Sequence, residues 1–327
     1  MFHACRTIFA LAVLLASATG GFAQDNPYRE DGWAKLPDGR KMGATSAIEV
    51  DRSGNVWVFE RCGGATGCAG SSVAPLIKFD ASGKYLASFG AGMFVQPHGI
   101  HIDRDVNIWV TDSQGKDGKG QVVVKFSPDG KTLLTLGKPG VAGAGEDKFN
   151  QPSAVVVAAN GDIFVADGHG GESNARIVKF SKDGRFIKTW GKKGTAAGEF
   201  DVPHAIAIDS SGRVFVGDRS NNRIQIFDQD GKYLTEWKQF GRPSGIYIDA
   251  NDMLYVADHA SDAKSNPGVT RGVRIGSTKD GVVKAFITGM GAQPETQSVG
   301  EGVMADAKGN VYWAETGGMT VRKFVKP

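Results

Sequence analysis

A six-bladed β-propeller is the fold that the sequence predicts, and three observations point to it. Glycine makes up 46 of 327 residues, about twice its usual share of ~7%, and no long stretch shows the 3.6-residue apolar period of a helix. Short runs of Val, Ile, Phe and Trp alternate with Asp-Gly, Ser-Gly and Asn-Gly turn signals, which is typical of an all-β chain. One strand-turn-strand unit also recurs six times along the chain.

The repeat unit reads apolar-x-apolar-Asp, a turn, and then apolar-aromatic-Val-x-acid. Its six copies are AIEVDRSGNVWVFE, GIHIDRDVNIWVTD, AVVVAANGDIFVAD, AIAIDSSGRVFVGD, GIYIDANDMLYVAD and GVMADAKGNVYWAE. The anchor positions are Asp51, Asp103, Ala158, Asp209, Asp249 and Asp306, and an acid follows each anchor nine residues later. Because these terminal acids recur in every copy, we interpret them as structural acceptors of hydrogen bonds at turns.

The spacing of the units fits propeller blades. Most units are followed by a third strand, as in RIVKF and RIQIF, and then by a fourth strand with Phe or Trp. The anchors lie 40 to 57 residues apart, which suits four-stranded blades and is too long for leucine-rich solenoid turns. Residues 43–327 are therefore predicted to form the propeller, and the segment 24–42 is predicted to supply the strand that closes the ring.

The start of the chain reads as an export signal covering residues 1–23. Arg6 gives a positive start, residues 8–15 an apolar run, and residues 21–23 a small-residue cleavage site. The run is shorter than the roughly 20 apolar residues that span a bilayer, and Cys5 precedes it, so no membrane or lipid anchor is expected. We predict a periplasmic or secreted protein.

The charge of the chain indicates which partners it can bind, and its cysteines indicate the chemistry of one loop. The net charge is +3 and the basic residues form no block, which leaves nucleic acid and membrane surfaces without support as partners. Cys62 and Cys68 remain after cleavage, in the loop CGGATGC. In an oxidising compartment this spacing favours a local disulfide, with two free thiols and a thiolate metal site as the alternatives.

One repeat position differs between copies in a regular way. In a propeller the first strand of each blade lines the central channel, so the residues five positions before the anchors form a ring. In blade order the ring reads Ser46, His98, Ser153, His204, Ser244 and Glu301. His98, His204 and Glu301 alternate with serines, about 120° apart, and two imidazoles and one carboxylate with open positions are the donors of catalytic zinc sites. The alternative is a polar channel lining that contacts water.

Residues that follow the terminal acids are expected to surround this ring. They include Arg61, His169, Arg219 and His259, and the Gly-rich loop GHGGESNAR lets His169 reach inward. We interpret Arg219, in the sequence RSNNR, as structural, and we expect His259 to face solvent in a polar loop. His101, in the middle of its strand, is expected to pack against the neighbouring sheet.

The repeat units resemble NHL repeats over about residues 43–325. The segments FVQPHGIHID and FDVPHAIAID, with VWVFER before them and ADGHGGESNARIVKF between them, resemble the peptidylamidoglycolate lyase family. This resemblance implies an enzyme that cleaves peptidyl-α-hydroxyglycine to a peptide amide and glyoxylate. It also implies zinc held by His98 and His204, and a substrate contact from Arg61.

The chain departs from the family pattern at three positions. Glu301 stands where the family has a third zinc histidine, and His169 stands where it has a tyrosine base. The acid that the family links to a structural calcium is Gly302 here, which speaks against that calcium. His169 is a candidate base because its ordinary pKa of about 6.5 is closer to neutrality than that of tyrosine.

The leading hypothesis is a lyase that depends on zinc or a similar divalent metal and acts on a small-molecule or peptide substrate. A separate monooxygenase would supply an α-hydroxyglycine substrate. One alternative is an NHL propeller without catalysis that binds a peptide, protein or small ligand. The other is a lactone or ester hydrolase around calcium, which prefers an all-oxygen shell that two histidines do not offer.

Overall fold

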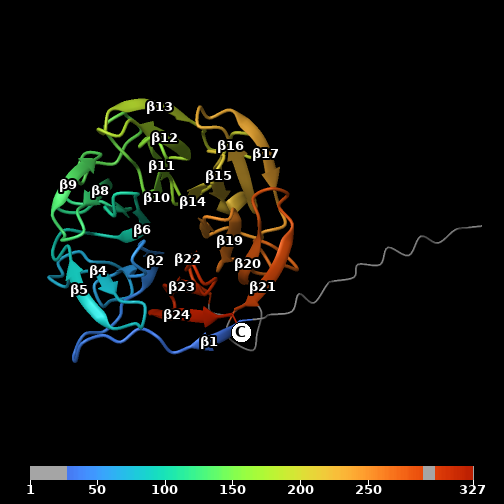
Figure 1. The fold of residues 1–327 in the computed structure, drawn as a ribbon. Helices are drawn as coiled ribbons and strands as arrows, with labels where there is room; N and C mark the ends of the chain where they lie inside the picture. The colour runs from blue at the N-terminus through green and yellow to red at the C-terminus, as the bar shows by residue number, and fades with distance from the viewer. Residues whose placement is uncertain (1–27, 290–298, 327) are drawn as a thin grey trace, which may run out of the picture.

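The computed structural model describes residues 28–289 and 299–326, and in these ranges it is a six-bladed β-propeller. Six four-stranded antiparallel sheets stand around a central channel (Figure 1). The predicted fold class is thereby confirmed. The predicted export signal lies outside the described residues. Among the described residues, no helix has the length and apolarity needed to cross a bilayer.

Five blades are built from four consecutive strands each, with the first strand at the channel and the fourth at the rim. Their bounds are β2 Thr45–Val50, β3 Val56–Glu60, β4 Leu76–Phe79 and β5 Tyr85–Phe89 in blade one; β6 Pro97–Ile102, β7 Ile108–Asp112, β8 Val122–Phe126 and β9 Thr132–Leu136 in blade two; β10 Pro152–Val157, β11 Ile163–Asp167, β12 Arg176–Phe180 and β13 Phe186–Trp190 in blade three; β14 Pro203–Ile208, β15 Val214–Asp218, β16 Arg223–Phe227 and β17 Tyr233–Trp237 in blade four; β18 Gly245–Ile248, β19 Met253–Asp258, β20 Gly272–Ser277 and β21 Val283–Thr288 in blade five. A 3-10 turn, η1 Arg219–Asn221, follows β15.

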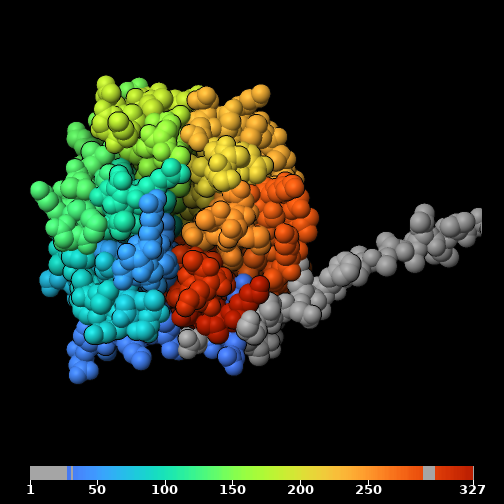
Figure 2. Space-filling model, viewed as in Figure 1, coloured from blue at the N-terminus to red at the C-terminus, as the bar shows by residue number. Residues whose placement is uncertain are grey.

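Blade six closes the ring. It combines β22 Gly302–Ala305, β23 Val311–Glu315 and β24 Thr320–Val325 with β1 Arg29–Asp31 from the start of the chain. β1 pairs antiparallel with β24 (Figure 1), as predicted for the closing strand. This pairing brings the last blade beside the first one, and the blades occupy successive sectors of the disc (Figure 2).

The anchor aspartates fix the turn between the first two strands of a blade. In blade one, the Asp51 carboxylate accepts hydrogen bonds from the amides of Ser53 and Asn55, both at 2.9 Å. The Trp57 indole donates to the same carboxylate at 3.1 Å. Trp57 is fully buried between blades one and two, so the repeat unit couples its turn to the apolar packing that holds neighbouring blades together.

Candidate metal centre

In blades one to four, a β-bulge separates the channel-facing residue from the pairing of the first strand. In blade four, Pro203 pairs with Asp218 and Ala205 with Gly217, which leaves His204 without a partner on β15. The same shift leaves Ser46, Ser153 and His98 unpaired. A bulge re-aims the side chain of its extra residue, and Ser46, His98, Ser153, His204, Ser244 and Glu301 all line one channel cavity of about 70 Å³.

The two ring histidines are held in one tautomer by the neighbouring blades. His98 Nδ1 lies 2.6 Å from the carbonyl oxygen of Ser153, and His204 Nδ1 lies 2.6 Å from that of Ser244. A carbonyl oxygen only accepts hydrogen bonds, so each Nδ1 carries a proton, and in a neutral imidazole the Nε2 atom then presents a lone pair. Orientation of a ligand histidine through its other nitrogen is a common feature of metal sites.

Glu301 completes the alternating set. Its Oε1 lies 3.5 Å from His98 Nε2 and 3.1 Å from His204 Nε2, yet both Nε2 atoms are buried and make no hydrogen bond. Burial, with the positive charge of Arg219 next, lowers the pKa of His204 to about 3. With both imidazoles neutral, two lone pairs face a buried carboxylate at short range, and a cation among them would remove this conflict. The residues fit a divalent metal.

His169 lies in the same cluster. Ligand atoms of His98, His169, His204 and Glu301 all lie within 4.8 Å of one another, and bonds from a divalent ion to nitrogen or oxygen are about 2.0–2.2 Å long. The His169 ring packs against those of His98 and His204, at centroid distances of 4.6 and 5.0 Å. Its Nε2 is also buried without a hydrogen bond. The structure thus offers four donors, three imidazoles and one carboxylate.

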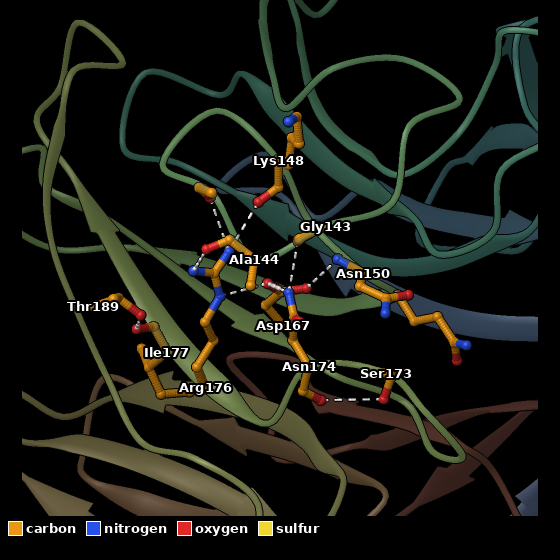
Figure 3. A network of polar contacts seen from close by, with 12 residues as sticks. Gly143, Ala144, Lys148, Asn150, Asp167, Ser173, Asn174, Arg176, Ile177 and Thr189 are labelled. Carbon is orange, nitrogen blue, oxygen red and sulfur yellow. Dashed lines mark hydrogen bonds and ion pairs between the residues drawn. The ribbon is translucent and has the colours of Figure 1, made fainter.

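The loop that carries His169 is tied down at both ends. The backbone amides of His169 and Gly170 donate to the hydroxyl of Ser173, at 3.0 and 2.9 Å. The Asn174 amide group donates to Asp167 at 2.7 Å and to the Gly143 carbonyl at 2.8 Å (Figure 3). These bonds hold the loop in place before any ligand binds, which is what a ligand supplied by a loop requires.

The terminal acids support the structure and do not face the cluster. Asp167 accepts hydrogen bonds from the Asn150 amide and from Arg176 Nε, both at 2.8 Å, and Arg176 also donates to the carbonyls of Ala144 and Lys148 (Figure 3). All six terminal acids are fully buried: Glu60, Asp112, Asp167, Asp218, Asp258 and Glu315. Their expected role as acceptors at turns agrees with these contacts.

Three arginines stand around the mouth of the channel. The Nε atoms of Arg61, Arg219 and Arg242 are buried and make no hydrogen bond. Burial lowers the pKa of Arg219 to about 10, and the negative charge of Glu301 opposes this shift. Burial lowers the pKa of Arg61 as well, again against Glu301. From the sequence we expected Arg61 to contact the substrate and Arg219 to be structural. Nothing in the sequence pointed to Arg242.

Two further histidines were interpreted from sequence. His101 lies 3.2 Å from Glu49 of the neighbouring blade, in line with a packed position. The exposure expected of His259 is wrong, because His259 is half-buried and its Nδ1 is buried without a hydrogen bond. Burial lowers the pKa of His259, and the nearby charge of Glu301 acts in the opposite direction, which places it within electrostatic reach of the cluster.

The loop that follows Arg61 contains a disulfide between Cys62 and Cys68. Cys68 is buried, and its amide donates to the Val95 carbonyl of the next blade at 2.8 Å. Of the alternatives open at the sequence level, the structure has the disulfide. The residue directly before it is Arg61, so the covalent loop restrains an arginine of the channel mouth.

A calcium ligand at position 302 does not fit the structure. A Cβ atom on Gly302 would lie 2.8 Å from the Ser46 carbonyl oxygen and 2.9 Å from the Ala47 Cα. A carboxylate there would require the backbones of blades six and one to move apart. The channel below the ring is instead lined by Gly, Ala, Ile and Val, which offer calcium no side-chain oxygen.

Comparisons with known proteins agree with this architecture. Residues 149–180 and 200–227, in blades three and four, match the NHL repeat family model. NHL repeat-containing protein 3 from Homo sapiens is 33% identical over 199 residues, which cover 59% of this chain and 54% of that protein. The chain is a six-bladed β-propeller that contains NHL repeats.

A second group of relatives consists of lyases. Peptidyl-alpha-hydroxyglycine alpha-amidating lyase 1 from Drosophila melanogaster is 34% identical over 196 residues, which cover 51% of this chain and 34% of that protein. The chain therefore resembles the amidating lyases, as predicted, and the matches span about half or less of the relatives' own length. A gluconolactonase from Xanthomonas campestris superposes with a TM-score of 0.59 at 14% identity over 88% of each chain, which shows the shared fold.

Proposed function

We propose that the protein is an exported, metal-dependent lyase that cleaves the carbon–nitrogen bond of an α-hydroxyglycine or a related carbinolamide. The observation that carries this proposal is the cluster of three buried, unbonded imidazole nitrogens around Glu301. Zinc is the metal we favour, because imidazole and carboxylate are among its usual ligands. The resemblance to amidating lyases supports the reaction class.

The proposed reaction is balanced without an oxidant. The carbon–nitrogen bond breaks, the hydroxyl oxygen becomes the carbonyl oxygen of an aldehyde such as glyoxylate, and the hydroxyl proton passes to the amide nitrogen. A bound divalent ion supplies Lewis acidity, which lowers the pKa of the substrate hydroxyl. A hydroxylating enzyme would have to supply the substrate.

His98, His204, Glu301 and His169 would hold the metal. The role of proton acceptor for His169 stays a prediction from the sequence. We instead assign it as the fourth ligand because its unbonded Nε2 lies within the cluster. His259 is then the remaining imidazole near Glu301, and we assign it the transfer of the proton through Nδ1, which is buried without a hydrogen bond.

Arg61 would bind the substrate carboxylate. Its guanidinium is half-buried, and no described residue offers it a hydrogen bond or an ion pair. A carboxylate with two oxygens matches the planar fork of an arginine. The arginine would therefore orient the substrate with its hydroxyl toward the cluster.

Elemental analysis of the purified protein tests the metal directly. We expect about one divalent ion per wild-type chain and none in a His98→Ala, His204→Ala double variant. His101→Ala is the matched control, because it removes a histidine from the same strand as His98 but pairs with Glu49 outside the cluster. The His101→Ala variant should keep its metal.

Turnover is the second readout. Wild-type protein should release glyoxylate from an N-acyl-α-hydroxyglycine, and the double variant should not. His169→Ala separates the two roles of that residue, since loss of metal supports a ligand and retained metal with lost turnover supports a base. If wild-type protein binds no divalent ion when zinc, manganese, iron and calcium are offered, the enzyme proposal fails and a ligand-binding propeller remains.

A further inference from the structure

The buried and half-buried arginines among the described residues form two groups, those whose side chain has a polar partner and those whose side chain has none. Every other buried or half-buried arginine has a hydrogen bond or ion pair: Arg40, Arg176, Arg213, Arg223, Arg271, Arg274 and Arg322. Only Arg61, Arg219 and Arg242 are half-buried with no side-chain partner among those residues. Desolvating a guanidinium without a partner is costly, so three such groups at one place indicate that something else balances them.

The three arginines surround the channel mouth from opposite sides. Arg61 follows the second strand of blade one and Arg219 follows the second strand of blade four, and these blades lie opposite each other in a ring of six. Arg242 precedes the ring position Ser244 in blade five, next to blade four. The charge of Arg242 also lowers the pKa of Arg219, so the two guanidiniums of these adjacent blades lie within electrostatic range of each other.

Among the described residues, no acid forms an ion pair with Arg219 or Arg242. Glu301 is enclosed between His98 and His204. The Asp258 carboxylate accepts a hydrogen bond from the backbone amide of Arg242, but it forms its ion pair with the side chain of Arg274. Asp262 is near enough for its charge to interact with Arg242, yet its oxygen already accepts hydrogen bonds from Lys264 and Ser265.

We infer that Arg219 and Arg242 form a second anion subsite, so that the substrate carries two acidic groups: one bound by Arg61 and the other by the Arg219–Arg242 pair across the metal cluster. The inference rests on the proposed function only in placing the substrate at this mouth. The second group is a carboxylate or a phosphate, both of which two guanidiniums can bind through charged hydrogen bonds.

Calorimetric binding, measured with zinc offered to the protein, tests the subsite without turnover. Glycolate and L-malate share an α-hydroxy acid, and malate adds a second carboxylate; glycerate and 3-phosphoglycerate form the matching pair for phosphate. We expect at least one dianion to bind about tenfold more tightly than its monoanion, the effect of one good charged hydrogen bond. The pair that shows the preference identifies the acidic group.

Variants locate the effect. Arg242→Gln should abolish the preference for the dianion and leave monoanion affinity within about twofold, whereas Arg104→Gln, an exposed arginine in the turn before β7, should change neither. Arg219→Gln serves as the second variant if Arg242→Gln does not fold. Equal binding of mono- and dianions by wild-type protein, or a preference that survives both substitutions, would overturn the inference.

Metal content separates this inference from the proposed function. A protein that binds metal and releases glyoxylate but shows no dianion preference contradicts only the second subsite. A protein that prefers dianions yet binds no metal contradicts only the lyase.

Discussion

Removing the disulfide next to Arg61 should lower the free energy of unfolding by an amount that follows from the length of the loop it closes. Cys62 and Cys68 are six residues apart, and closing a loop of this length removes enough unfolded-state entropy to stabilise the fold by about 2 kcal/mol. A Cys62→Ser, Cys68→Ser double variant should therefore lose about that much free energy of unfolding. Urea denaturation at fixed pH, with and without reductant, measures the loss.

Loss of the disulfide should also change substrate binding, independently of its effect on stability. Without the covalent loop, Arg61 is held by fewer restraints, so KM for a carboxylate substrate should rise several-fold while metal content stays near one ion per chain. Wild-type protein under reductant should behave like the variant, and the variant itself should not respond to reductant. An unfolding free energy that reductant leaves unchanged within about 0.5 kcal/mol would refute the entropic argument.

Two further predictions concern the channel wall and a buried acid. Gly99→Ala would place a Cβ atom 2.6 Å from the Ser153 carbonyl oxygen that orients His98, so we expect at least a tenfold loss of metal affinity, measured by competition with a chromogenic chelator; unchanged affinity would show that this carbonyl does not set the ligand geometry. Burial raises the pKa of Asp112 to about 6, despite hydrogen bonds from the amides of Val95 and Gln96. Because the folded-state pKa lies above the unfolded value of 3.8, the stability linked to this proton is complete below pH 4 and is lost as the pH rises through 6, by about 3 kcal/mol. Carbon-13 NMR of the Asp112 carboxyl group should show a midpoint near 6, and a midpoint at or below 4 would contradict this.

The alternating ring was predictable because the repeat fixes its own geometry. Counting back five residues from each anchor finds the same place in every blade, and His98, His204 and Glu301 indeed line one cavity. The sequence did not reveal the β-bulges that separate His98 and His204 from the strand pairing. A bulge depends on how the blades fit around the channel, which no single repeat encodes.

Loop residues were less predictable for a physical reason. His169 was expected to reach inward because its loop is Gly-rich, and the structure places it against His98 and His204. His259 and Arg219 lie in loops that were interpreted as exposed or structural, yet both have buried nitrogens without a hydrogen bond. The path of such a loop depends on contacts with neighbouring blades, as in the bond from Asn222 of blade four to the Ser265 carbonyl of blade five, and these contacts leave no local pattern.

Ser46 and Ser153, like the two ring histidines, bond to a carbonyl of the next blade, and this explains how a metal site fits into a repeat fold. Ser46 donates to the Pro97 carbonyl of the next blade at 3.1 Å, and Ser153 donates to that of Pro203 at 2.6 Å. His98 and His204 also bond to the next blade, through Nδ1, but to the carbonyl one position further along, that of the ring residues Ser153 and Ser244. A histidine at this position therefore still bonds to the next blade, at the neighbouring carbonyl, and adds a second nitrogen directed at the channel. Because only the added nitrogen is free to bind a ligand, the ring can change from structural to metal-binding without a change in how the blades pack, and substrate choice is left to the arginines and loops at the mouth.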